Sequence, residues 1–287
     1  MTQPDPLLIQ KLVRVALAED HAARDVTTAA LVPPEQQGRA AVCAKAEGVL
    51  AGLLVAQAAF AEVDGRLRWI AVKADGDALR PGDRIAEVSG PLASILRGER
   101  VALNFLTHLS GVATAAHEVV RTLEGTACKL RDTRKTIPGL RALEKYAARM
   151  GGAQNHRLDL ADGVLIKDNH IAALRSRDLG IADAVRLARA AQTTMHIEIE
   201  VTDVEEAREA IEAGADELLL DNMSPGEMRK VVALAAGREP RPLLEASGGI
   251  TLANARQVAE TGVDYISMGA ITHSAPALDM SLEVEVG

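Results

Sequence analysis

The pattern of apolar and polar positions divides the chain into two halves. In the first half, apolar positions recur at helical spacing near the N-terminus, at Leu8, Leu12, Val15 and Ala16, and predict an amphipathic helix. The rest of this half predicts short strands and helices separated by turn residues, namely strands over 38–47, 67–74 and 83–88, a helix over 52–63, and a helix opened by Pro91 that continues through Leu109. This mixture is typical of a small α+β domain.

From about residue 126 the pattern becomes regular, because short apolar strands alternate with amphipathic helices. We expect strands over 127–132, 163–167, 196–201, 217–221, 243–247 and 265–269. We expect helices over 139–149, 182–191, 203–213, 224–236 and 251–261. Such alternation predicts a parallel sheet with right-handed crossovers, and these strands are fewer than the eight of a complete barrel. The predicted fold class is therefore α/β, with an N-terminal domain over 1–112, joined by a C-terminal strand at about 278–287, and an open, incomplete parallel α/β barrel over 113–277.

Composition and charge narrow the classes of protein. The 287 residues carry a formal net charge of -8, which argues against a general nucleic-acid binder or a binder of anionic membranes. The N-terminal segment has a helical pattern instead of that of a signal peptide, and no apolar run approaches ~18 residues. We therefore predict a cytoplasmic protein with no nucleic-acid and no membrane partner. Cys43 and Cys128 lack CxxC spacing and are expected to be buried, reduced thiols.

Cationic side chains gather at the predicted strand ends. In parallel barrels the reactive groups lie at the C-terminal ends of the strands. There the sequence places Arg134, Lys135 and Lys167, and we expect Arg157 and His156 to lie at the same mouth of the barrel. Like charges brought together are costly unless an anion neutralises them, and arginine offers a planar fork to carboxylates and phosphates. We expect these side chains to converge on a ligand that carries several negative charges.

Acidic and glycine-rich positions complete the predicted site. Glu200 and Asp221 are suited to hold Mg²⁺ or ribose hydroxyls, whereas Glu198, deeper on the same strand face, is either catalytic or a structural partner of a lysine. Ser247, Gly248 and Gly249 precede a predicted helix start near Thr251, where backbone N–H groups bind phosphate. Gly269 ends the next strand in a similar way, and His273 follows shortly after it.

Several of these runs match a known family. They are GERVALNFLTHLSGVAT (98–114), DTRKTIPGLRALEKYAARMGGAQNHR (132–157), GVLIKDNHI (163–171), EIEV (198–201), LLDNM (219–223), EASGGI (245–250) and YISMGAITHSAPALDMSL (265–282). The chain closely resembles the quinolinate phosphoribosyltransferases over essentially its whole length. The resemblance implies an N-terminal α/β sandwich domain plus an open α/β barrel. It also implies that quinolinate and phosphoribosyl pyrophosphate react, with Mg²⁺, to give nicotinate mononucleotide, CO₂ and pyrophosphate in the de novo synthesis of NAD.

The resemblance also assigns roles to residues. It implies that Arg134, His156 and Arg157 hold the quinolinate carboxylates, with Arg100 added by the partner subunit of a homodimer that shares its active sites. Lys135 and Lys167 face the charges of the substrates, and Glu200 and Asp221 bind ribose or Mg²⁺, directly or through water. The residues that line the phosphate sites are Ser247, Gly248, Gly249, Gly269 and His273. An assembly larger than a dimer stays open.

Two other interpretations compete with this one. A related phosphoribosyltransferase-like protein associated with molybdenum transport would have a different substrate, and the full arginine and histidine set favours quinolinate over it. A catalytically silent anion-binding protein is possible on the same fold, because fold alone does not determine function. The presence of Lys135, Lys167, Glu200 and Asp221 disfavours a silent protein, which has no need for buried charges.

Overall fold

The computed structural model describes residues 3–285, which fall into two compact units. The first unit contains the N-terminal segment up to His117, the segment Ile137–Gly152 and the C-terminal segment from Ile271. The second unit contains Glu118–Thr136 and Ala153–Ala270. The units are thus interleaved along the chain. The prediction returned only the final strand, about 278–287, to the first domain over 1–112, whereas the structure also places Ile137–Gly152 in the first unit.

The first unit is built on an antiparallel sheet in the order β12-β1-β5-β3. Its strands are β1 (Gln37–Ala44), β3 (Arg68–Ala71), β5 (Arg84–Pro91) and β12 (Met280–Glu285), and a separate small pair joins β2 (Gly48–Val49) to β4 (Ala78–Leu79). The predicted return of the final strand is confirmed, because β12 pairs with β1. Residues 286 and 287, at the end of that predicted strand, lie outside the described residues.

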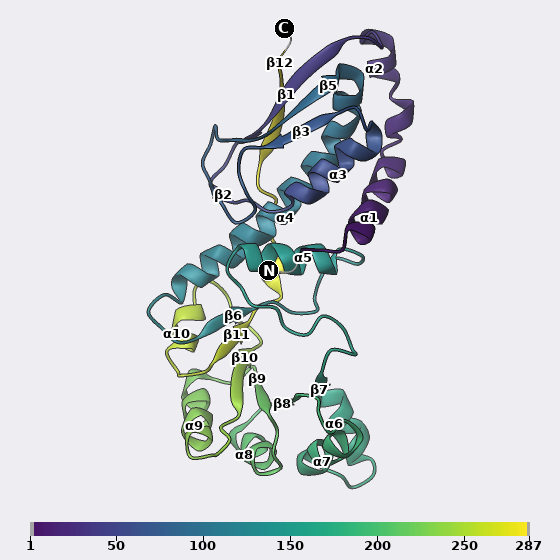
Figure 1. Cartoon of the computed structure of the whole chain (residues 1–287). Coiled ribbons are helices and arrows are strands. Elements are labelled where there is room, and N and C mark those ends of the chain that lie inside the picture. Colours follow the sequence, from purple (N-terminus) through teal and green to yellow (C-terminus); the bar gives the residue numbers. More distant parts are fainter. Residues whose placement is uncertain (1–2, 286–287) are drawn as a thin grey trace. The chain divides into compact units, whose positions relative to one another are not determined.

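The other elements of this unit are helices (Figure 1). They are α1 (Pro6–Glu19), the short 3-10 helix η1 (Ala22–Arg24), α2 (Val26–Leu31), α3 (Leu53–Val63), the first part of α4 (Leu92–Thr122), α5 (Arg141–Met150) and α11 (Ala270–His273), whose first residue belongs to the second unit. Helix α1 lies against α3 and buries Ile9 and Val13. The predicted amphipathic helix is confirmed: Leu8, Leu12 and Ala16 are half-buried, and only Val15, 60% exposed, lies outside the buried side.

The long helix α4 differs from its prediction at both ends. Pro91 still pairs with Gln37 in the sheet, so the helix begins one residue later, at Leu92. It continues to Thr122, well beyond Leu109. Its buried positions, among them Leu106, Leu109 and Val112, keep helical spacing across the predicted end, because the apolar face of the helix continues.

The second unit is an open sheet of six parallel strands in the order β6-β11-β10-β9-β8-β7. The strands are β6 (Lys129–Arg131), β7 (Val164–Ile166), β8 (Ile197–Val201), β9 (Glu217–Asp221), β10 (Leu243–Ser247) and β11 (Tyr265–Ser267). Among the described residues β6 and β7 form the two edges of this sheet and do not pair with each other. The predicted α/β fold class with an open, incomplete parallel barrel is confirmed.

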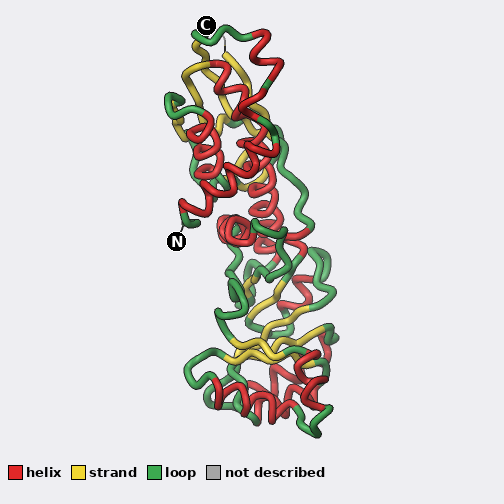
Figure 2. The backbone as a smooth tube through the Cα atoms, turned by 90° about the vertical axis from the view of Figure 1, so that its right-hand side faces the viewer, coloured by secondary structure: helices red, strands yellow, loops and turns green. Residues whose placement is uncertain are grey.

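Helices of the second unit lie along the outer face of this sheet (Figures 1 and 2). They are α6 (Asp168–Arg175), α7 (Ile181–Ala191), α8 (Val204–Glu212), α9 (Pro225–Ala236) and α10 (Ala255–Ala259). Helix α6 was not predicted; it starts directly after Lys167, where the backbone N–H of Lys167 donates to His170 Nδ1 at 2.9 Å. Helix α10 is shorter than the predicted helix over 251–261.

The cysteines and the lengths of the helices test two further expectations from the sequence. Cys43 and Cys128 are free and buried, which confirms the expected structural thiols. Within residues 3–285 no helix has both the length and the apolar character that crossing a bilayer requires.

Candidate active site

The register of the parallel sheet brings the predicted acidic residues to one edge. Asp221 ends β9 directly beside Ser247 at the end of β10, and Glu200 stands one residue before the end of β8. Because all of these strands run the same way, their C-terminal ends lie together. The sheet therefore places side chains from separate loops within reach of one ligand.

Glu200, Asp221 and Lys167 form an electrostatic group at this edge. Burial, and then the negative charge of Asp221, raise the pKa of Glu200, while Lys167 opposes that rise. Two carboxylates that disfavour each other's ionisation are stabilised by a cation placed between them. The donor set therefore fits a divalent ion that also contacts substrate phosphates, or the hydroxyls of a sugar.

Arg134 and Arg157 are the second pair. Burial, and then the charge of Arg134, lower the pKa of Arg157. Nη1 of Arg157 donates to the carbonyl of Gly163 at 3.1 Å, but the Nε atoms of both arginines are buried without a hydrogen-bond partner. Two neighbouring guanidinium groups with unused donors are suited to the carboxylates of a dianion. Lys135, on the same loop, is exposed.

The loops after β9 and β10 pack tightly on each other. Gly248 has φ +81, and a Cβ atom there would lie 2.3 Å from Oδ1 of Asn222. Asn222 itself has φ 53; its backbone N–H donates to the carbonyl of Ser247 at 2.9 Å, and its Nδ2 donates to Oδ2 of Asp221 at 2.7 Å. The glycine is therefore needed for close approach, and Asn222 links the glycine loop to the Asp221 carboxylate.

One expectation about these glycines was wrong. Helix α10 begins at Ala255, and the N–H of Thr251 donates to Oδ1 of Asn254 at 2.7 Å instead of starting a helix. Gly248 and Gly249 thus lie in a loop with positive φ angles, well before the helix N-terminus. Any phosphate contact here comes from the backbone of that loop. Gly269 directly precedes the short helix α11.

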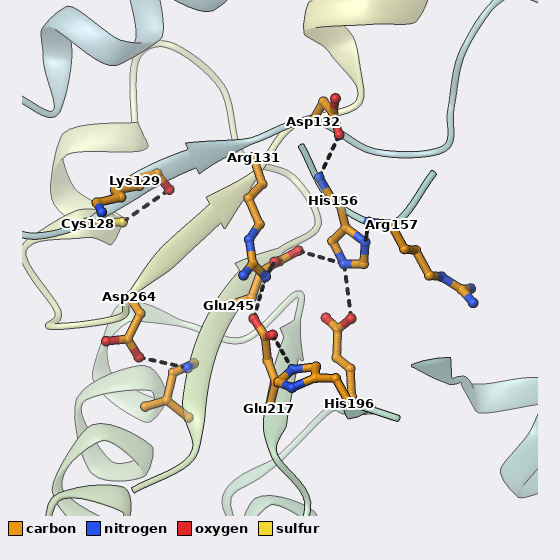
Figure 3. Close-up of polar contacts among 12 residues, drawn as sticks. Cys128, Lys129, Arg131, Asp132, His156, Arg157, His196, Glu217, Glu245 and Asp264 are labelled. Carbon is orange, nitrogen blue, oxygen red and sulfur yellow. Dashed lines mark hydrogen bonds and ion pairs between the residues drawn. The ribbon is translucent and has the colours of Figure 1, made fainter. Parts of the chain in front are cut away.

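A buried charge network lies beneath the predicted site, and the sequence had singled out only part of it (Figure 3). Arg131 on β6 donates through Nη1 to Glu217 at 2.5 Å and to Glu245 at 2.6 Å, and its guanidinium lies 3.4 Å from the ring centroid of Tyr265. Glu217 also contacts Nε2 of His196 at 2.8 Å. Charged residues inside apolar strands were the available signal, but pairing them required the register between strands.

His156 joins this network to the predicted site. Its Nε2 lies 3.0 Å from Glu198 and 3.7 Å from Glu245, and its Nδ1 accepts the backbone N–H of Arg157 at 2.8 Å. The backbone N–H of His156 donates to the fully buried Asp132 at 2.9 Å. Figure 3 shows the side chain of Arg157 pointing away from the network. Glu198 is therefore a buried partner of a histidine, where a lysine was one of the expected partners.

Two predicted residues lie in the first unit. Arg100 lies on α4, is exposed, and makes no ion pair with a described residue. His273 ends α11, and its Nδ1 lies 2.6 Å from Oγ of Ser274. The structure thus leaves the guanidinium of Arg100 available for a contact outside its own helix.

The fold and this edge of the sheet define a class of transferases. Residues 25–110 match the model of the quinolinate phosphoribosyl transferase N-terminal domain, and residues 112–283 match that of the C-terminal domain. The chain belongs to the quinolinate phosphoribosyl transferase family.

Named relatives agree with this assignment. The chain is 45% identical over 279 residues to a probable nicotinate-nucleotide pyrophosphorylase (carboxylating) of Bacillus subtilis, covering 97% of this chain and 94% of the relative. It is 42% identical to the human nicotinate-nucleotide pyrophosphorylase (carboxylating), covering 97% and 92%. The solved structure of the Francisella tularensis nicotinate-nucleotide pyrophosphorylase has a TM-score of 0.93 at 38% identity, covering 99% of this chain and 98% of that one.

Proposed function

We propose that this enzyme transfers the phosphoribosyl group of phosphoribosyl pyrophosphate to quinolinate and removes CO₂, giving nicotinate mononucleotide and pyrophosphate in the de novo synthesis of NAD. The observation that carries the proposal is the pair Arg134 and Arg157, neighbouring cations whose buried Nε donors lack partners. The carboxylate pair Glu200 and Asp221, which interacts with Lys167, lies at the same sheet edge. Relatives that cover nearly the whole chain carry the name of this activity.

Arg134 and Arg157 bind the two carboxylates of quinolinate and orient its ring. The backbone N–H of Arg157 donates to His156, and this hydrogen bond fixes the position of the backbone from which the guanidinium of Arg157 extends. Lys135 and Lys167 add positive charge for the anionic groups of both substrates. Positioning two polyanions against each other is the main task, because the reaction needs no covalent enzyme intermediate.

The sugar and phosphate groups occupy the loops after the later strands. The backbone around Ser247, Gly248, Gly249 and Gly269 and the side chain of His273 take the phosphates. When the pyridine nitrogen bonds to ribose C1 and the C1–pyrophosphate bond breaks, positive charge develops on the sugar. Glu200 and Asp221 stabilise that charge. CO₂ then leaves, the electron pair of its bond stays on C2, where the neighbouring positive nitrogen stabilises the carbanion, and C2 takes up a proton.

The carboxylates of Glu200 and Asp221 are also the residues that would hold Mg²⁺, directly or through water, because they repel each other in its absence. Bound Mg²⁺ would supply charge neutralisation to the departing pyrophosphate. Asn222 fixes Asp221 from the side, so one carboxylate of the pair has a defined orientation.

We further propose a homodimer in which Arg100 completes the partner's site. The exposed, unpaired guanidinium of Arg100 supports this proposal. Mixing inactive Arg100→Ala and Lys135→Ala proteins under subunit exchange should restore part of the activity, because one mixed site carries neither lesion. Proven exchange without any recovery would contradict a shared site. A cytoplasmic location remains a prediction.

The direct test is an assay of the purified protein with quinolinate, phosphoribosyl pyrophosphate and Mg²⁺, following CO₂ and the nucleotide. We expect turnover with quinolinate and a strong preference for it over nicotinate, because a site built for two carboxylates leaves donors unpaired when one is missing. Comparable turnover of nicotinate, or none of quinolinate, would refute the proposal.

A further inference from the structure

The network below Arg157 contains more acid than its bases can neutralise. Glu198, Glu217 and Glu245 are 3%, 2% and 0% exposed; Glu217 and Glu245 share the guanidinium of Arg131, and Glu198 lies 3.0 Å from Nε2 of His156. One acceptor oxygen each of Glu198 and Glu245, with a ring nitrogen of His156, lie within 4.8 Å of one another. Buried carboxylates this close cannot all ionise unless positive charge compensates them.

The ring of His156 does not supply that charge. Its Nδ1 accepts the N–H of Arg157 at 2.8 Å, so Nδ1 carries no proton. The one ring proton then lies on Nε2 and is donated to Glu198 at 3.0 Å. Against the effect of burial, Glu198 and Glu245 raise the pKa of His156, but a proton on Nδ1 would break the hydrogen bond from Arg157, so this geometry favours a neutral imidazole between the Arg157 backbone and Glu198.

The remaining bases are committed to other partners. His196 is half exposed and contacts Glu217 through its Nε2 at 2.8 Å, at the outer side of the network. Arg131, held over Tyr265, is divided between Glu217 and Glu245. Glu198 accepts the hydrogen bond from Nε2 of His156, so the only cation that Glu245 contacts within 3 Å among the described residues is Arg131, which it shares with Glu217. Its Oε1 is buried and has no hydrogen-bond partner.

We propose that Glu245 keeps a proton in the active enzyme, and that its ionisation weakens binding of the dicarboxylate substrate without changing the fold. Resting on the proposed function, this makes Glu245 a positioning residue that acts through His156 and Arg157. A new negative charge beneath these two residues opposes a dianion above them. Burial first, and then the charge of Glu198, raise the pKa of Glu245 to about 7; Arg131 and any positive charge on His156 oppose the rise, and Glu217 adds to it.

Glu245→Gln tests this, because glutamine keeps the shape and the acceptor oxygen for Arg131 but cannot ionise. In the wild-type enzyme we expect the KM for quinolinate to rise roughly tenfold between about pH 6.5 and about pH 8.5, as one charge at about 10 Å implies. In Glu245→Gln the KM for quinolinate should match the wild-type value at the lower pH and stay there. The KM for phosphoribosyl pyrophosphate should change alike in both proteins.

Asp75→Asn is the matched control. Asp75 is another acid whose pKa burial raises; it accepts a hydrogen bond from Tyr146 at 2.8 Å within the first unit. Its substitution should leave the pH dependence of the KM as in the wild type. If Glu245→Gln shows the same rise with pH as wild type, the proposal is refuted.

A second readout does not depend on turnover. Difference infrared spectra should show a protonated carboxyl band that is present at about pH 6 in wild type, lost with rising pH, and missing in Glu245→Gln. If no band depends on Glu245, the proposal is overturned even when the enzyme is active. If the band is present but quinolinate is not turned over, only the proposed function is refuted.

Glu217→Gln supplies an independent variant if Glu245→Gln folds poorly. It leaves Arg131 to Glu245 alone and removes a neighbouring negative charge. Glu245 should then lose its proton more easily, so the rise of KM should begin at a lower pH. An unchanged profile in a folded Glu217→Gln protein counts against the proposal.

Discussion

The close packing of Gly248 on Asn222 gives the sharpest prediction about the site. In Gly248→Ala the new Cβ would lie 2.3 Å from Oδ1, 2.5 Å from Cγ and 2.7 Å from Nδ2 of Asn222. The whole amide must move, although its Nδ2 is bonded to Asp221 and its backbone to Ser247. The substitution therefore has two effects: it strains the loop, and it displaces the Asp221 carboxylate through Asn222.

The magnitude follows from two contributions. An alanine at φ +81 is in the left-handed region, which costs about 1–2 kcal/mol. Overpacking against a fixed neighbour adds about 1–3 kcal/mol. The summed loss of about 2–5 kcal/mol should lower Tm by roughly 5–15 °C in a unit of this size. Displacing Asp221 should also lower kcat/KM at least about tenfold.

Gly214→Ala is the control for backbone strain alone. Gly214 has φ +84, and its added Cβ would meet no atom within 4 Å. Thermal unfolding of both variants separates the strain from the overlap, and steady-state kinetics tests the effect on Asp221. Equal Tm losses for Gly248→Ala and Gly214→Ala, with wild-type kcat/KM in both, would show that Asn222 yields freely and that the reasoning is wrong.

Two further predictions concern charge. Arg134→Lys keeps the charge but loses the bidentate fork, so kcat/KM for quinolinate should fall at least about tenfold at unchanged Tm; wild-type kinetics would make Arg134 a surface residue. The hydrogen bond to Glu217 raises the pKa of His196 despite an opposing effect of burial. That bond therefore adds stability that is full below pH 6.5 and is lost as pH rises through the folded-state pKa. His196→Gln should lower Tm more at about pH 5.5 than at about pH 8.5, and an equal loss at both would contradict this sign.

The local pattern of apolar residues was sufficient to predict the limits of strands that are buried on both faces. The strands Glu217–Asp221 and Leu243–Ser247 have their predicted limits, because short apolar runs ended by turn residues specify buried parallel strands. On α1 the pattern identified half-buried positions but included the exposed Val15 and missed the buried Ile9 and Val13, which contact with α3 selects. It also began the predicted helix 251–261 four residues too early, because the side chain of Asn254 accepts a hydrogen bond from the N–H of Thr251 before α10 begins at Ala255. Such local side-chain bonds compete with helix formation.

The sequence by itself determined the order of strands and helices along the chain, the open parallel sheet, and the presence of Arg134, Glu200 and Asp221 at strand ends. Tertiary structure decided which charges meet. Register places Glu198 opposite Glu217, and the sheet order β6-β11-β10-β9 lets Arg131 on β6 reach both Glu245 on β10 and Glu217 on β9. These partners lie far apart in the chain, and no local pattern encodes their distance. Burial then fixes the charge of each group, because a carboxylate loses its water only when the sheet closes over it.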